Sequence, residues 1–143
     1  MMLKIVEEFK ARGHPNVMAT HPTTLEITKD FSITKKGDCI VAVEATKGLM
    51  ELSEEFRAVC MNDKSRILVE LHASGMVERV VGRGSHLLTL SDEEELVIRK
   101  STYVSNRTLM VDADKAAADL RRQFIRRLKS SSTEIHIHLT ACL

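Results

Sequence analysis

Two histidines and an asparagine lie close together in one polar segment near the start of the chain, GHPNVMATHP, residues 13–22. The candidate ligand-binding residues here are His14, Asn16, His21 and, just after the segment, Thr23. An imidazole can move protons near neutral pH, and an amide can orient a polar ligand. We therefore predict a rigid loop that presents these side chains to a small ligand. The alternative is a structural turn in which Asn16 and the threonines bond the local backbone.

A second segment, IRKSTYVSNRT, residues 98–108, combines cations with hydroxyls. Its candidate ligand-binding residues are Arg99, Ser101 and Arg107. Phosphates and carboxylates are bound by such charge-assisted donors, and arginine can bind them with two parallel hydrogen bonds. We predict that this segment and the early loop meet around one hollow that holds a small polar or anionic ligand. The alternative is an edge strand protected by its charges.

No motif in the sequence identifies a reaction. A P-loop, a dinucleotide fingerprint, a nucleophile elbow and an HExxH helix are all missing, so catalytic residues, cofactors and enzymatic activity stay undetermined. The cysteines, Cys39, Cys60 and Cys142, form no CxxC pair, and we predict no metal site. His136 and His138 lie on one face of a predicted strand, where they either reach a common ion or are simply solvated.

Residues 112–129 have apolar side chains at helical spacing and many cations, and we predict a helix capped by Asp112. Its basic face suggests a second function, a non-catalytic domain that docks protein or RNA. The net charge of +1 and the scarcity of aromatic residues argue against a dedicated nucleic-acid-binding protein. A third hypothesis is a structural homo-oligomer whose exposed strand edges pair.

Alternating apolar and polar residues predict the strands that must position these groups. The expected strands are 3–11, 23–29, 39–43, 66–73, 76–81, 87–90, 95–101 and 133–141. A short helix is expected at 53–62, with Ser53 as its N-cap. Glu7 interrupts an apolar series, and its pKa would rise if it faced inward. We find no internal repeat. Many strands with two interposed helices predict an α+β fold, a mostly antiparallel, β-rich, jelly-roll-like sandwich.

The composition sets the class of protein. A chain of 143 residues with 43% hydrophobic and 29% charged residues is expected to form a single globular domain, residues 1–143. No apolar run approaches the roughly 20 residues of a membrane span, and the first residues do not form a secretory signal. We therefore expect a cytoplasmic protein with reduced thiols and no membrane partner.

Several irregular strings together resemble an archaeal family catalogued as domain of unknown function 371. The matching strings are RGHPNVMATHPTTLEIT (12–28), KKGDCIVAV (35–43), LSEEF (52–56), IRKSTYVSNRTLMV (98–111) and ADKAAADL (113–120). They follow one another over most of the chain. The resemblance implies a compact β-rich sandwich and a small cytosolic archaeal protein, and it implies no activity.

Overall fold

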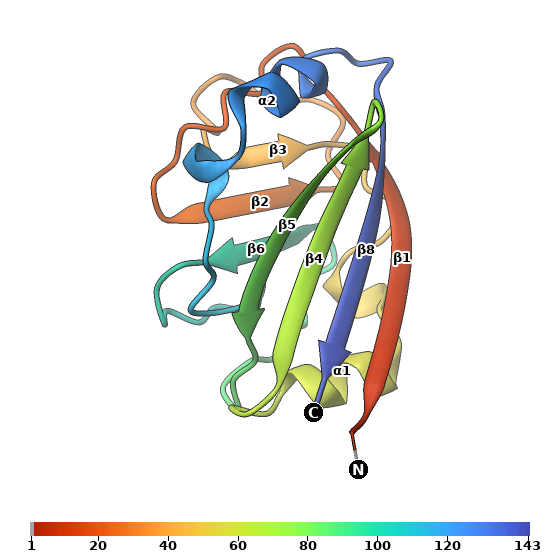
Figure 1. The fold of residues 1–143 in the computed structure, drawn as a ribbon, viewed down its shortest axis with the longest axis vertical. Coiled ribbons are helices and arrows are strands. Elements are labelled where there is room, and N and C mark those ends of the chain that lie inside the picture. Colours follow the sequence, from red (N-terminus) through yellow and green to blue (C-terminus); the bar gives the residue numbers. More distant parts are fainter. Residues whose placement is uncertain (1) are drawn as a thin grey trace.

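Two four-stranded sheets lie face to face, and the strands of one run across the strands of the other (Figure 1). The computed structural model describes residues 2–143. Sheet A has the order β1-β8-β4-β5, with β1 (Lys4–Arg12), β4 (Arg66–Ala73), β5 (Met76–Arg83) and β8 (Glu134–Cys142). Sheet B has the order β3-β2-β6-β7, with β2 (Thr24–Thr28), β3 (Ile40–Ala42), β6 (Glu95–Arg99) and β7 (Thr108–Met110). The predicted α+β class, with mostly antiparallel strands and two helices, is confirmed.

Strand alternation determines which face of sheet A is buried. In β4, Ile67, Val69 and Leu71 are almost fully buried, while the side chains between them are partly exposed. Sheet B differs, because four successive residues of β2 are buried although they point alternately to its two faces. Polar Glu26 and Thr28 are therefore enclosed on the side of sheet B that faces away from sheet A, where the sequence predicts a half-solvated face.

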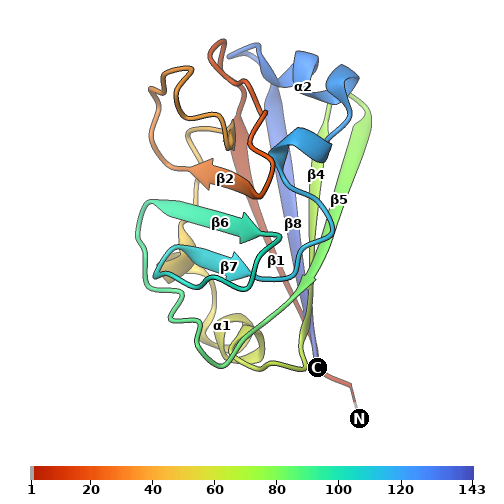
Figure 2. The same ribbon diagram turned by 90° about the vertical axis from the view of Figure 1, so that its left-hand side faces the viewer.

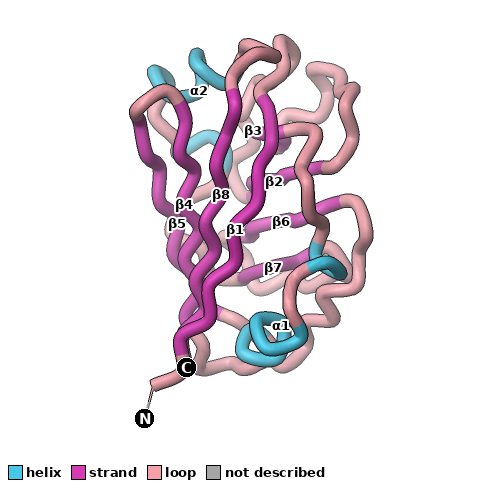
Figure 3. Tube along the Cα trace, turned by 90° about the vertical axis from the view of Figure 1, so that its right-hand side faces the viewer, coloured by secondary structure: helices cyan, strands magenta, loops and turns pink. Residues whose placement is uncertain are grey.

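Each end of the sandwich is closed by one short helix (Figure 3). The helix α1 (Glu54–Cys60) begins after Ser53, whose hydroxyl accepts the Phe56 N–H at 3.1 Å, as predicted. The helix α2 (Arg122–Leu128) begins ten residues later than predicted. Two single 3-10 turns precede these helices, at Leu49–Glu51 and Ala117–Asp119. None of the helices in the described part of the chain is long and apolar enough to cross a bilayer.

The expected strand at 87–90 and the expected Asp112 cap are wrong. Leu88 N–H bonds the Ser85 carbonyl in a turn, and Leu90 has a φ of 49°, which ends an extended segment. Asp112 also has a positive φ, 51°, and begins an extended stretch rather than a helix. Its neighbour Asp114 is held on β5, with backbone and side-chain hydrogen bonds to Val81 of 2.9 Å each. These contacts outweigh the helical spacing of the sequence.

The second half of the chain repeats the first, contrary to our expectation of no repeat. Strands β1, β2 and β3, a 3-10 turn, α1 and β4 are followed in the same order by β5, β6, β7, a 3-10 turn, α2 and β8. An isolated bridge joins Arg12 to Val43 in the first half and Arg83 to Val111 in the second. The central pair of each sheet, β8 with β4 and β2 with β6, contains one strand from each half. The two halves are thus interleaved around an approximate two-fold axis.

Candidate functional site

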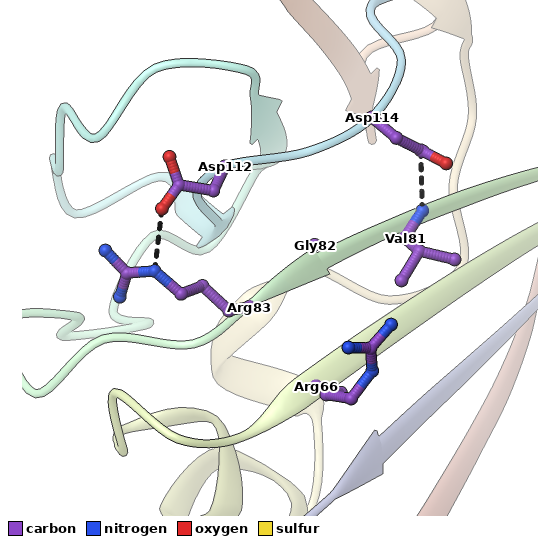
Figure 4. Close-up of a pocket in the computed structure, with 6 residues that line it drawn as sticks. All are labelled: Arg66, Val81, Gly82, Arg83, Asp112 and Asp114. Atoms are coloured by element: carbon purple, nitrogen blue, oxygen red, sulfur yellow. Dashed lines mark hydrogen bonds and ion pairs between the residues drawn. The ribbon is translucent and has the colours of Figure 1, made fainter.

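A polar hollow of about 450 Å³ lies beside β5 (Figure 4). It is lined by Arg66, Val81, Gly82, Arg83, Asp112 and Asp114. Three of its four charged side chains have partners: Arg83 Nε donates to Asp112 at 2.7 Å, and the Val81 N–H donates to Asp114 at 2.9 Å. A smaller hollow of about 130 Å³ occupies the equivalent place beside β1 in the first half. Because both halves form this feature, we attribute the hollow to the fold.

The two predicted segments meet where β2 begins and β6 ends. Figure 2 shows these strands side by side, and Thr24 stands opposite Arg99 in their antiparallel register. Beyond the pair, the Lys100 N–H donates to the Thr23 carbonyl at 3.0 Å. The early loop and the cationic segment therefore meet at one end of the central strand pair of sheet B.

Arg99 is the central side chain at this end of the strand pair. Its residue is only 9% exposed, and its guanidinium donates through Nε to Thr108 Oγ1 at 2.8 Å and through Nη2 to Ser105 Oγ at 3.1 Å. The ring of Tyr103 covers it, with the guanidinium carbon 4.8 Å from the ring centroid. Within residues 2–143 no carboxylate forms an ion pair with Arg99. Burial, followed by the charge of Arg107, lowers the pKa of Arg99.

One edge of the Arg99 guanidinium is open. Nη1 donates to no group in the described residues, and it is not one of the enclosed polar atoms that lack a partner. Nη1 is therefore not fully enclosed, and the ring of Tyr103 that covers the guanidinium is itself exposed. The arrangement leaves a positively charged donor directed at the surface while the other donors are held in place.

Arg107 lies in a different charge environment. It donates to Glu95 at 2.8 Å and lies 3.5 Å from the carboxylate of Glu26. Burial first, and then the hydrogen bond and charge of Glu95, raise the pKa of Glu26 to about 8, against the opposing charges of Arg107 and Arg99. The same hydrogen bond lowers the pKa of Glu95. At neutral pH Glu26 is therefore mostly protonated, and the charge of Glu95 offsets that of Arg107 alone.

These protonation states leave Arg99 as an uncompensated charge. Glu26 is the carboxyl group of β2 that interacts with Arg99, and in its neutral form it contributes no negative charge. Cys39, next to Glu26, has a pKa raised to about 11 by burial, so its thiol is neutral as well. Two hydroxyls and an aromatic ring remain as the partners of the buried cation. A buried cation with only neutral partners is costly and favours an added anion.

The other predicted residues lie at varying distances from this end of the strand pair. His21 Nδ1 accepts the Thr24 N–H at 3.1 Å and caps the start of β2. His14 and Asn16 form a separate turn, in which the Asn16 N–H donates to His14 Nδ1 at 3.0 Å and the amide donates to the Ile33 carbonyl at 2.8 Å. Ser101 is exposed, and its hydroxyl accepts the Tyr103 N–H at 3.3 Å. The backbone of Thr23 thus lies beside that of Lys100, with His21 bonded to the same turn, while His14 and Asn16 have local backbone partners.

The basic face predicted at 112–129 is not one continuous helical surface. Arg121 donates to Glu78 and to the Val77 carbonyl. Arg122 donates to several backbone carbonyls, including that of Ala19 at 2.9 Å. Within the described residues, Arg126 and Arg127 take part in no ion pair and lie on the exposed side of α2. The structure uses about half of the predicted cationic surface to attach α2 to the sandwich.

The edges of sheet A, which the homo-oligomer hypothesis requires, are partly covered. The Arg12 and Val43 backbones exchange two hydrogen bonds beside β1, and the Arg83 and Val111 backbones do the same beside β5. These segments occupy backbone N–H and C=O groups of the edge strands that would otherwise be available to pair with a second chain.

Sequence reasoning missed Glu26, Glu95, Ser105 and Thr108. Glu26 has the one available signal, a carboxyl group between the two apolar residues Leu25 and Ile27. The repeat gives a further clue, because Thr28 holds the place in the first half that Arg99 holds in the second. The fold therefore does not require an arginine there. Among residues 2–143, no three His, Cys, Asp or Glu side chains already surround a common point suitable for a metal ion.

Comparison with known proteins places the chain among archaeal relatives. The family described as Domain of unknown function (DUF371) matches residues 9–142. An uncharacterised protein from Methanocaldococcus jannaschii is 44% identical over 120 residues, which cover 84% of this chain and 88% of that protein. Neither description states an activity.

Proposed function

The chain belongs to the DUF371 family, and we propose that it binds a small anion, a phosphate or a carboxylate, at the guanidinium of Arg99. The observation that carries this proposal is the 9% exposure of Arg99 together with its lack of a carboxylate partner in residues 2–143. A guanidinium withdrawn from water is stabilised by charged partners, which an anion on Nη1 would supply.

The surroundings of Arg99 favour an oxyanion over a neutral ligand. Thr108 and Ser105 hold Nε and Nη2 in place, so the guanidinium is oriented before a ligand arrives. Such preorganisation lowers the entropic cost of binding. Thr23 and His21, at the start of β2, and Arg107, on the far side of Arg99, form the rim that we include in the site. Protonated Glu26 donates its one O–H to Glu95, so it places no repelling negative charge beside Arg99.

The experiment is isothermal titration calorimetry with inorganic phosphate and with succinate, at constant ionic strength. We expect saturable binding by the wild-type protein. Arg99→Gln should lose about 10- to 100-fold in affinity, because that is what the loss of one charge-assisted hydrogen bond costs. Arg99→Lys, which keeps the charge but not the planar fork, separates charge from geometry. Arg126→Gln, at an exposed arginine of α2, is the matched control. Equal affinities for Arg99→Gln and Arg126→Gln would overturn the proposal.

A further inference from the structure

Three histidines lie close together on the solvent-facing side of sheet A. His72 of β4 stands directly opposite His136 of β8 in the antiparallel register. His138 lies two residues further along β8, on the same face. The rings of His72 and His138 are in contact, with centroids 4.6 Å apart. The sequence indicated the pair on β8, and the sheet adds the third imidazole from the neighbouring strand.

Each of these imidazoles has a carboxylate on one ring nitrogen. His136 Nε2 lies 2.8 Å from Glu134, His138 Nδ1 lies 3.2 Å from Glu8, and His72 Nε2 lies 3.7 Å from Glu70. In the described residues, the second nitrogen of each ring takes part in no hydrogen bond or ion pair. In many metal-binding histidines a carboxylate orients the ring through one nitrogen while the other nitrogen binds the ion. Glu134 and Glu8 lie near enough to His136 and His138 for this role, whereas Glu70 does not bond His72.

His72 provides a second and independent observation. Its Nε2 atom is enclosed and has no hydrogen-bond partner in residues 2–143, because the 3.7 Å separation from Glu70 is too long for a hydrogen bond. A hollow of about 420 Å³ lies next to this ring, lined by His72, Glu134, His136 and the β4–β5 turn. The ring therefore has space to turn and an unsatisfied polar atom that favours turning.

The repeat shows that the fold does not demand this cluster. The positions equivalent to His72, His136 and His138 in the other half are Thr140, Leu68 and Glu70. The local charge also favours a cation, because Glu8, Glu70 and Glu134 outnumber the cations paired with them, Lys10 and Arg79.

We propose that His72, His136 and His138 form a binding site for Zn²⁺ or a similar imidazole-preferring dication on the open face of sheet A. Two histidines on one strand and a third on the adjacent strand supply the three nitrogens of an open, three-histidine site. The rings of His72 and His138 are tilted by 56° to each other, and the three imidazoles do not yet surround a common point, so binding requires rotation about their side-chain torsions. These rings are between 34% and 51% exposed and turn without disturbing the core.

The test is calorimetry with Zn²⁺ alone on the full chain, together with the absorption spectrum of the Co²⁺-loaded protein. We expect one ion per chain, a Co²⁺ spectrum without thiolate bands, and at least about a tenfold loss of affinity for each of His72→Gln, His136→Gln and His138→Gln. His86→Gln is the matched control, since His86 is also exposed and lies 2.9 Å from a carboxylate, that of Asp63. Circular dichroism confirms that each variant is folded.

Two outcomes would overturn the proposal. One is Zn²⁺ affinity that is unchanged when all three histidines are replaced together. The other is loss of binding in Cys142→Ser with no loss in the histidine variants, which would assign the ion to the thiol. Arg99→Gln should bind Zn²⁺ as the wild-type protein does, so the anion site and the metal site can fail separately.

Discussion

Glu7 and Glu78 occupy equivalent places in the two halves of the chain. Glu7 accepts the Ser53 N–H at 2.7 Å and pairs with Lys47 at 2.9 Å. Glu78 accepts the Arg121 N–H, also at 2.7 Å, and pairs with Lys115 at 3.8 Å. Each carboxylate ties the first strand of its half to the residue before the helix. Burial acts to raise the pKa of Glu7, but the hydrogen bonds from Ser53 and Lys47 outweigh it, and the pKa is lowered.

Replacing either glutamate should destabilise the protein by a similar amount. Glu7→Gln and Glu78→Gln each replace the charged acceptor of the N–H before the helix by a neutral one and remove an ion pair with a lysine, at a cost of about 1 kcal/mol. Urea unfolding monitored by circular dichroism measures both free energies, with the exposed Glu93→Gln as a control that should change little. A large effect at one site and none at the other would contradict the equivalence of the two halves.

Glu26 should make the folded state less stable as the pH rises. Its pKa is about 8 in the folded protein and near 4.5 when unfolded, so the folded state binds the extra proton between these values. Stability is therefore highest below about pH 4.5, as far as this group is concerned, and declines towards pH 8 by at most about 1.4 kcal/mol per pH unit. Glu26→Gln should remove this decline in urea unfolding measured from pH 5 to 8. A wild-type slope that persists in the variant would contradict the assignment.

Gly13 and Gly84 should not tolerate alanine. A Cβ on Gly13 would clash with the carbonyls of Leu128 and Ser130, and one on Gly84 would clash with the Cys60 carbonyl. These atoms are backbone at the ends of the two helices and cannot turn aside. Each substitution should cost about 1–3 kcal/mol or more in free energy of unfolding. Lys64→Ala, at an exposed side chain, is the control, and a neutral Gly84→Ala would show that the helix end can move.

The repeat explains what the sequence reveals and what it conceals. The strand of residues 66–73 and the Ser53 cap could be predicted because alternation and capping are local signals. The helix start at Asp112 was wrong because the contact of Asp114 with Val81 joins residues far apart in the sequence. The duplication was missed since most equivalent positions hold different residues, as at Ala19 and Leu90, which share a backbone φ of 50° and 49° and full burial but differ in size.

The candidate site was predictable only in part. Arg99 and Arg107 were chosen for their chemistry, and Thr23 for its place in a polar loop. Their different roles depend on burial and on Glu26 and Glu95, which strand pairing places beside them. The protonation of Glu26 depends on the enclosed outer face of sheet B, and no local pattern in the sequence indicates that enclosure.

Phosphate should stabilise the wild-type protein against heat. An anion that binds only the folded state raises the unfolding free energy by RT ln(1 + [L]/Kd), about 2.7 kcal/mol at one hundred times Kd. Calorimetric unfolding in phosphate and in chloride, at matched ionic strength and pH, should show a higher Tm in phosphate for the wild-type protein and for Arg126→Gln. Arg99→Gln should show no such difference. An equal shift in all three proteins would indicate a general salt effect.

The most direct measurement is the arginine side-chain region of the ¹⁵N–¹H NMR spectrum while inorganic phosphate is added to the wild-type protein. The account predicts that the Arg99 Nε signal, fixed on Thr108, shifts and saturates, while the signals of Arg126 and Arg127 stay in place. An Arg99 signal that does not move, or that moves only as much as those of the exposed arginines, would contradict the anion site.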